Sequence, residues 1–159
     1  MSRAFVKESD QEIETLPERA ISPHPNLVTA KGLERLDLSI RELEAERTSA
    51  RSAGDTAVLA RVARDLRYFH TRRETARLVT PPAAADQIRF GMTVRLALTD
   101  HSERTFQLVG EDEADPKQGL LSYVSPLATA LMGKSIGEEV LFGGQSERAE
   151  IIALECDCT

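Results

Sequence analysis

The sequence predicts an α+β protein in which an antiparallel helical hairpin precedes a small β-sheet domain with one short helix. Between residues 33 and 69, apolar residues recur at alternating spacings of three and four, which is the heptad pattern of helices that pack along one face. Pro81 and Pro82 end that pattern, because neither can continue a helix. From residue 93 onward, apolar and polar residues alternate, which is the period of half-buried strands.

The first part of the chain lacks the signals of a regular element. Residues 1–28 show little periodicity and contain Pro23 and Pro25. Because these prolines block a helix, we expect an extended or disordered arm over residues 1–28. Thr29 follows the arm and is suited to cap the first helix.

Residues 29–79 are expected to form the hairpin. Gly54 is suited to end the first helix, and Asp55 is suited to cap the second. Two helices joined by so short a turn run antiparallel and bury each other's seam, with arms of about 20 to 25 residues and roughly 30 to 37 Å. The predicted seam consists of Leu33, Leu36, Ile40, Leu43, Leu59, Val62, Leu66 and Phe69.

Charge is distributed unevenly in this chain, whose formal net charge is −6: residues 29–79 are net positive and residues 80–159 are net negative. The positive charge of the hairpin is too modest for a duplex-DNA-binding surface of its own. Its second helix nevertheless carries a row of guanidinium groups, which suit phosphate or carboxylate partners, including the glutamates of the first helix. The arginines are Arg61, Arg64, Arg67, Arg72, Arg73 and Arg77, and the glutamates are Glu42, Glu44 and Glu46.

A linker is expected over residues 80–87 and the β domain over residues 88–159. Ser125 is suited to cap a helix, Pro126 to its first position, and Gly133 to the left-handed residue after its last turn. A short helix is therefore predicted between two strands. The predicted strands are residues 93–99, 105–109, 119–124, 139–142 and 148–154.

The sequence contains no P-loop, dinucleotide-binding glycine motif, GxSxG or HExxH motif. Cys156 and Cys158 are too close to staple a fold and the histidines are too scattered to complete a zinc site, so we expect no metal site and a reducing cytoplasmic location. No run approaches the roughly 20 apolar residues of a membrane span, so no membrane association is expected. The acidic segment Glu111–Asp115 is either a solvated loop or, less commonly, a cation-binding loop.

Two segments of the β domain resemble a known family. Gly110–Asp115 resembles the acidic loop, and Ser122–Lys134 the Ser-Pro helix, of the C-terminal domain of the bacterial GreA/GreB transcription elongation factors. Together with the hairpin and linker, the resemblance extends from about Thr29 to Glu155. It implies an FKBP-like fold for residues 88–159 and RNA polymerase as the partner, with docking at the rim of the secondary channel. The resemblance assigns partner binding to Glu111, Asp112, Val124, Ser125, Pro126 and Leu127, and Val124 stands where the family often has Asp.

The hairpin tip departs from the family's pattern. In cleavage-active members, Asp and Glu three residues apart help to hold a second Mg²⁺ at the polymerase active centre. Here Asp55 matches the first acid, whereas Val58 stands at the position of the second and offers no oxygen to a metal. The arms are also shorter than is typical. The resemblance therefore implies an accessory factor, not an enzyme, that modulates transcription with weak or no cleavage stimulation and has no cofactor beyond polymerase-bound Mg²⁺.

Other functions stay open from the sequence. Asp55 could act with another nearby acid in genuine cleavage, or the chain could regulate a different enzyme, as the related nucleoside-diphosphate-kinase regulators do. The arginine-rich second helix suggests contact with nascent RNA. Prolyl isomerase activity is disfavoured, because it needs an aromatic-lined pocket and aromatic residues make up 4% of the chain, with no Trp.

Overall fold

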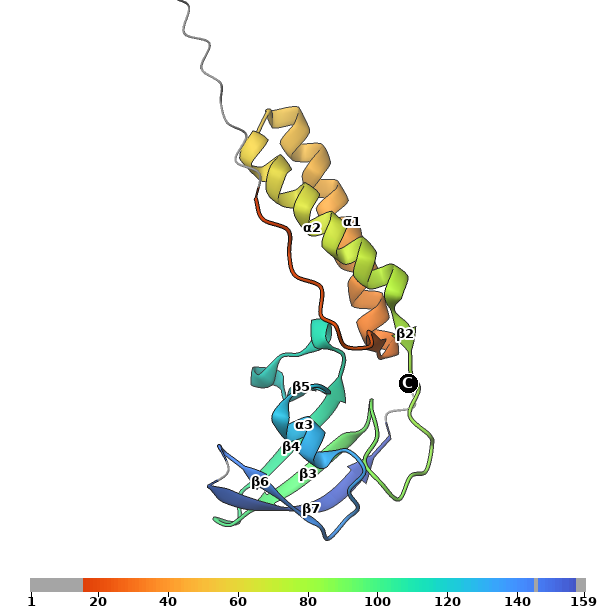
Figure 1. Cartoon of the computed structure of the whole chain (residues 1–159), viewed down its shortest axis with the longest axis vertical. Helices are drawn as coiled ribbons and strands as arrows, with labels where there is room; N and C mark the ends of the chain where they lie inside the picture. The colour runs from red at the N-terminus through yellow and green to blue at the C-terminus, as the bar shows by residue number, and fades with distance from the viewer. Residues whose placement is uncertain (1–15, 145, 157–159) are drawn as a thin grey trace, which may run out of the picture.

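The computed structural model describes residues 16–144 and 146–156 and shows a helical hairpin projecting from a small β domain (Figure 1). The predicted α+β class is confirmed. The hairpin side comprises β1 (Leu27–Val28), α1 (Ala30–Ala53), α2 (Thr56–Thr75) and β2 (Arg77–Leu78). The β domain comprises β3 (Thr93–Leu98), β4 (Glu103–Val109), the 3₁₀ helices η1 (Glu111–Glu113) and η2 (Pro116–Gln118), β5 (Leu120–Ser122), α3 (Pro126–Leu131), β6 (Glu139–Phe142) and β7 (Glu147–Glu155).

The helix caps of the hairpin are those that the sequence predicts. Thr29 Oγ1 accepts a hydrogen bond from the Gly32 amide at 3.0 Å, and Asp55 Oδ1 accepts one from the Val58 amide at 3.0 Å. Gly54 follows α1 with a φ of 67°, in the left-handed region that glycine adopts at little cost. The turn at Gly54 and Asp55 reverses the chain, so α1 and α2, with 24 and 20 residues, lie antiparallel.

The seam between α1 and α2 is buried at its centre and partly open at its sides. Leu36, Val62 and Leu66 are buried, and the other predicted seam residues are half-buried. Glu42 and Glu44, which lie off the seam, are exposed. This gradient is expected of a two-helix hairpin, in which only the centre of the apolar stripe is covered completely by the partner helix. No helix among the described residues has both the length and the apolarity needed to cross a membrane.

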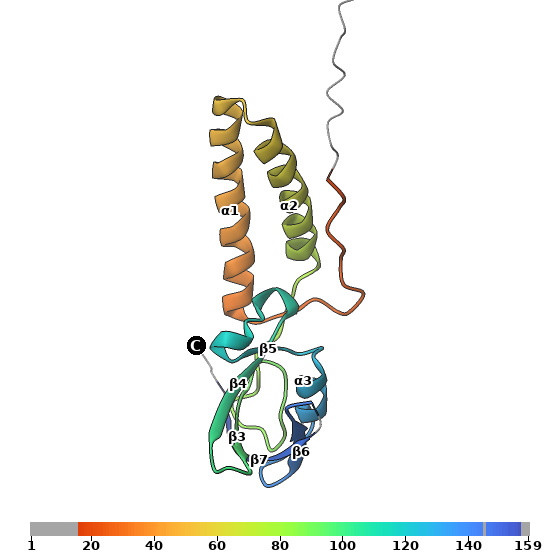
Figure 2. The ribbon, with the colours of Figure 1, turned by 90° about the vertical axis from the view of Figure 1, so that its left-hand side faces the viewer.

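The arm lies beside α2 over its described part, residues 16–28 (Figure 2). The Arg19 guanidinium lies 3.8 Å from the centroid of the Tyr68 ring, and its Nη1 lies 3.6 Å from Asp65 Oδ1. At the base of the hairpin, β1 pairs in parallel with β2. Residues 1–15 of the predicted arm lie outside the described residues.

The β domain is a mixed five-stranded sheet in the order β5-β4-β3-β7-β6. The pair β4 and β5 is parallel, and the other neighbours are antiparallel. Alternation along β3 places Val94, Leu96 and Leu98 in the core, as the period of two predicts. Helix α3 packs beside β6 and contributes Ala128 and Leu131 to the same core.

Candidate partner-binding site

Helix α3 begins where the sequence predicts. Ser125 Oγ accepts a hydrogen bond from the Ala128 amide at 3.3 Å, and Pro126 occupies the first turn. Gly133, just after the helix, has a φ of 83°. The cap fixes the direction in which α3 leaves the preceding turn, which contains the half-buried Val124.

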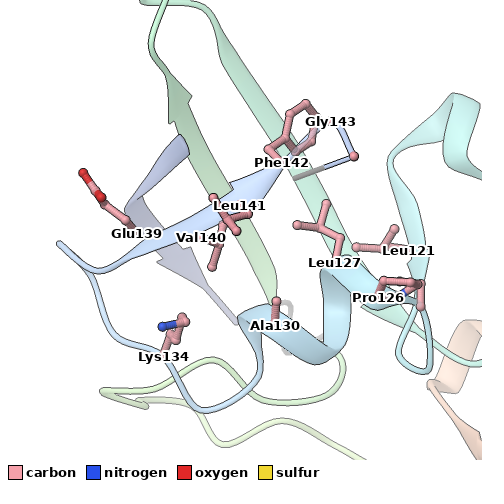
Figure 3. Close-up of a pocket in the computed structure, with 12 residues that line it drawn as sticks. Leu121, Pro126, Leu127, Ala130, Lys134, Glu139, Val140, Leu141, Phe142 and Gly143 are labelled. Atoms are coloured by element: carbon pink, nitrogen blue, oxygen red, sulfur yellow. The ribbon is translucent and has the colours of Figure 1, made fainter. Parts of the chain in front are cut away.

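A groove of about 700 Å³ lies between α3 and β6 (Figure 3). The predicted contact residues Ser125, Pro126 and Leu127 line it from the α3 side, and Leu141 and Phe142 line it from β6. The structure therefore places three predicted contact residues together on a concave surface, whereas Val124 lies in the turn next to them.

The surroundings of the groove combine apolar surface with charge. Leu141, which lines the groove from β6, is 51% exposed. Lys134 and Glu139 also line the groove and lie toward one end of it in Figure 3. Exposed apolar side chains beside a concave surface with a few charged groups are typical of a binding site.

The other two predicted contact residues, Glu111 and Asp112, lie in η1 at the base of the hairpin. The Asp112 carboxylate accepts hydrogen bonds from Arg72 Nε at 2.5 Å and from the Tyr68 hydroxyl at 2.6 Å. Arg72 Nη2 also lies 3.7 Å from Glu111 Oε2. Both carboxylates thus face partners on α2, and neither lines the groove. Direct contact of Glu111 and Asp112 with a partner stays a prediction.

Sequence reasoning missed the special position of Arg72. The sequence predicts a surface row of arginines on α2, with Glu42, Glu44 and Glu46 of α1 as partners for some of them. The structure confirms one such pair, Arg61 with Glu46, whereas Arg64 pairs with its neighbour Asp65. Arg72 is buried and turned toward the β domain.

Tyr68 has a perturbed pKa because of this junction. Burial of the ring, followed by the hydrogen bond to the Asp112 carboxylate, raises the pKa of Tyr68 from its ordinary value of 10.0 to about 12. Both effects disfavour the phenolate, since the anion loses hydration and would face a second negative charge.

The free energy of unfolding is therefore expected to fall as pH rises from 10 to 12, and to fall more steeply in the wild type than in Tyr68→Phe. Between pH 10 and 12, the folded protein keeps the Tyr68 proton that the unfolded chain has lost, so the free energy of unfolding decreases as pH rises. Below pH 10, Tyr68 is protonated in both states, and its contribution to the free energy of unfolding is fully present. Urea denaturation of both proteins at about pH 9 and about pH 11 measures the difference. Equal pH dependence in the two proteins would contradict the assignment.

The hairpin tip presents one carboxylate. Asp55 is exposed and caps α2, and Val58 is half-buried. The next carboxylates along the two helices are Glu46 and Asp65, and each is paired with an arginine. Among residues 16–144 and 146–156, no three His, Cys, Asp or Glu side chains gather as a metal site would require.

A projecting hairpin joined to a domain with an open apolar groove is typical of proteins that bind a macromolecular partner. Residues 82–155 match the family model "Transcription elongation factor, GreA/GreB, C-term". Transcription elongation factor GreA of Paracoccus denitrificans (strain Pd 1222) is 36% identical over 148 residues, which cover 80% of this chain and 95% of that protein. Transcription elongation factor GreB of Neisseria meningitidis serogroup B is 38% identical over 96 residues, or 59% of each chain. The chain therefore belongs to the GreA/GreB family of transcription elongation factors.

Solved structures of similar proteins align less closely. GreA factor homolog 1 of Thermus thermophilus is 16% identical, with a TM-score of 0.41 over 83% of this chain and 99% of that one. The GreA/GreB factor of Nitrosomonas europaea is 20% identical, with a TM-score of 0.41 over 81% of this chain and 98% of that one.

Proposed function

We propose that this chain binds RNA polymerase through the groove between α3 and β6, projects its hairpin into the secondary channel, and modulates transcription with weak or no stimulation of transcript cleavage. It acts as an accessory factor, is not an enzyme itself, and carries no cofactor of its own. The observation that carries the docking part is the position of Ser125, Pro126 and Leu127. The family resemblance assigns these residues to docking, and they line an open, largely apolar groove.

The tip supports the part of the proposal that concerns cleavage. Asp55 is the tip's single acid, and its carboxylate already accepts a hydrogen bond from the Val58 amide. At a helix N-terminus this negative charge is favoured by the backbone N–H groups, so a structural role accounts for Asp55. A cleavage factor must bring enough oxygen ligands to hold a second metal at the polymerase active centre. Asp55, a single carboxylate that already caps a helix, therefore does not replace the two acids with which cleavage-active members hold the metal.

Contact of α2 with nascent RNA has less support from the structure. Binding to phosphates requires available guanidinium groups. The arginines of α2 are largely occupied by carboxylates of the same chain. The pairs are Arg61 with Glu46, Arg64 with Asp65, Arg67 with Glu18, Arg72 with Asp112, and Arg73 with Asp37. The groove remains the favoured surface for the partner.

Charged substitutions in the groove are expected to remove binding to RNA polymerase. Changing Pro126 and Leu127 together to Glu removes two apolar side chains from the groove and places two carboxylates on an apolar surface that the partner would have to desolvate. Loss of a central apolar contact of this kind costs at least about 2 kcal/mol, so the affinity for core polymerase should fall by roughly 30-fold or more. Titration of core polymerase with the fluorescently labelled protein measures this affinity.

The matched control is Thr129→Glu, which adds a carboxylate to an exposed position of α3 outside the groove. It should bind as the wild type does. If the double variant keeps its fold, as judged by circular dichroism, and binds with unchanged affinity, docking takes place on another surface.

A further inference from the structure

The junction between hairpin and β domain is closed by an ion pair between the buried Arg72 and the half-buried Asp112. Arg72 on α2 is 1% exposed, and its guanidinium is held by Asp112 of η1, with Glu111 next to it. Tyr68, one turn earlier on α2, donates its hydroxyl hydrogen to the other oxygen of the same Asp112 carboxylate. An arginine buried without its carboxylate is costly, so this pair strongly favours one placement of α2 against η1.

A second link joins η1 to the other helix of the hairpin. Glu113 is 5% exposed, and one of its carboxylate oxygens accepts from the Thr29 amide at 3.1 Å and from the Gly110 amide at 3.2 Å. Its other oxygen accepts from the Thr29 hydroxyl. The helix backbone approaches so closely here that a Cβ on Gly32 would lie 2.1 Å from Glu113 Cδ. Any other residue at position 32 would clash with the Glu113 side chain, so only glycine lets α1 approach Glu113 this closely.

The arm closes the same junction from a third side. The Asn26 side-chain amide donates to the Arg72 carbonyl oxygen at 2.6 Å. The Tyr123 hydroxyl, next to the start of α3, donates to the Pro25 carbonyl oxygen at 2.5 Å. Residues 79–87, which connect hairpin and sheet along the chain, contain no helix or strand, so the covalent connection alone does not fix an angle.

We infer that the acidic segment Gly110–Glu113 is a joint that fixes the direction of the hairpin relative to the docking groove, with Arg72, Asp112 and Glu113 as its positioning residues. Each helix of the hairpin is attached to a different carboxylate of this segment, α2 to the half-buried Asp112 and α1 to the buried Glu113. Two attachments on different helices oppose both tilting and rotation of the hairpin.

The consequence for transcription rests on the proposed function. With the groove docked on the polymerase, the hairpin acts as a lever whose 20-residue α2 is about 30 Å long, so a tilt of about 20° moves the tip by roughly 10 Å. The segment would thus control where the tip lies and leave the affinity of docking unchanged. If Asp112 instead contacted the polymerase directly, its substitution would lower the affinity and leave the direction of the hairpin unchanged.

The test measures the hairpin direction in the free protein. Nitroxide labels are attached at Ala53→Cys, next to the hairpin tip, and at Thr99→Cys, in the exposed turn after β3, with Cys156 and Cys158 replaced by Ser. Double electron–electron resonance should give one narrow distance population for the otherwise wild-type protein. Asp112→Asn should broaden that population or shift it by roughly 10 Å, because Arg72 loses its counter-charge.

Two further variants keep the result interpretable. Asp37→Asn removes the exposed partner of Arg73, the residue next to Arg72, and should leave the distance population unchanged. Gly32→Ala disturbs the joint from α1 without changing any charge and should broaden the population as Asp112→Asn does. Wild-type distances in both joint variants, or equal broadening in Asp37→Asn, would overturn the inference. If Asp112→Asn loses helical content, the distance population of Gly32→Ala decides whether the segment fixes the hairpin direction.

Binding to core polymerase supplies the functional readout. Gly32→Ala, which disturbs the joint at a residue outside the predicted docking set, should keep the affinity of the wild type while photo-crosslinking from the hairpin tip to the polymerase falls. A loss of affinity in Asp112→Asn with an unchanged distance population would identify Asp112 as a docking residue and overturn the inference. If the wild type itself fails to bind, the proposed function fails, and the distance measurements still decide whether the segment is a joint.

Discussion

RNA cleavage in backtracked RNA polymerase complexes is expected to proceed at the same rate with and without this protein. A second metal at the polymerase active centre lowers the barrier to hydrolysis only while enough ligands hold it and its water in place. The tip offers Asp55 alone, with Val58 where cleavage-active relatives have the second acid.

Other carboxylates cannot replace the missing acid without a rearrangement. Glu46 and Asp65 lie roughly 10 and 15 Å from the tip, counted along the helices at 1.5 Å per residue. Both are engaged by arginines, Glu46 by Arg61 and Asp65 by Arg64. To reach a metal beyond the tip, either would have to leave its partner and cross about two or three helical turns.

The measurement is the rate of RNA shortening in stalled complexes at neutral pH with Mg²⁺, with and without the protein. The informative variant is Asp55→Ser, because Ser keeps the helix cap and removes the carboxylate. Both proteins should leave the rate unchanged and should slow cleavage by an active Gre factor through competition for the channel. Strong stimulation by the wild type that disappears in Asp55→Ser would restore the cleavage role.

Features with local causes could be predicted from the sequence. Thr29, Gly54, Asp55 and Ser125 occupy the cap positions expected of them, because a cap depends on backbone groups only a few residues away. The strands β3 and β4 follow from the period of two for the same reason. The groove residues of α3 could also be named, since the family resemblance covers them.

The junction could not be predicted, because its partners are distant in the chain. Arg72 lies 40 residues from Asp112, and a charged residue on a helix is usually exposed. Only the fold shows that the acidic segment faces α2. One signal was present in the sequence: Gly32 lies inside a helical pattern, where glycine is unfavourable unless another group approaches the backbone closely. Glu113 is that group.

The contacts of the arm could not be predicted either, for the same reason. Pro23 and Pro25 correctly exclude a helix, but no local pattern indicates that Arg19 lies over the Tyr68 ring. The sequence predicts charge pairs across the hairpin, and the pair of Arg61 with Glu46 is one of them. Arg67 pairs instead with Glu18 of the arm, 49 residues away, which the sequence does not indicate.

Truncation of the hairpin seam is expected to have the largest effect on stability. Leu66 is 4% exposed at the centre of the contact between α1 and α2. Leu66→Ala removes three methyl or methylene equivalents from a site that the rigid helices cannot fully close, which costs about 2 to 5 kcal/mol. Because the β domain has its own core around Leu96, Leu108 and Ile151, the hairpin should loosen well before the sheet does.

Amide hydrogen exchange followed by residue-resolved detection measures the two parts separately. Exchange in α1 and α2 should accelerate in Leu66→Ala, by the factor that corresponds to the lost free energy, while β3 and β7 keep their protection. The matched control is Leu38→Ala, the same substitution on α1 at a side chain that is 47% exposed, and its effect should be small. Equal acceleration by both variants would mean that the buried Leu66 and the exposed Leu38 contribute equally to hairpin stability, which would contradict the prediction. Because the proposed joint holds the base of the hairpin and not its seam, loosening in Leu66→Ala should be greatest toward the tip.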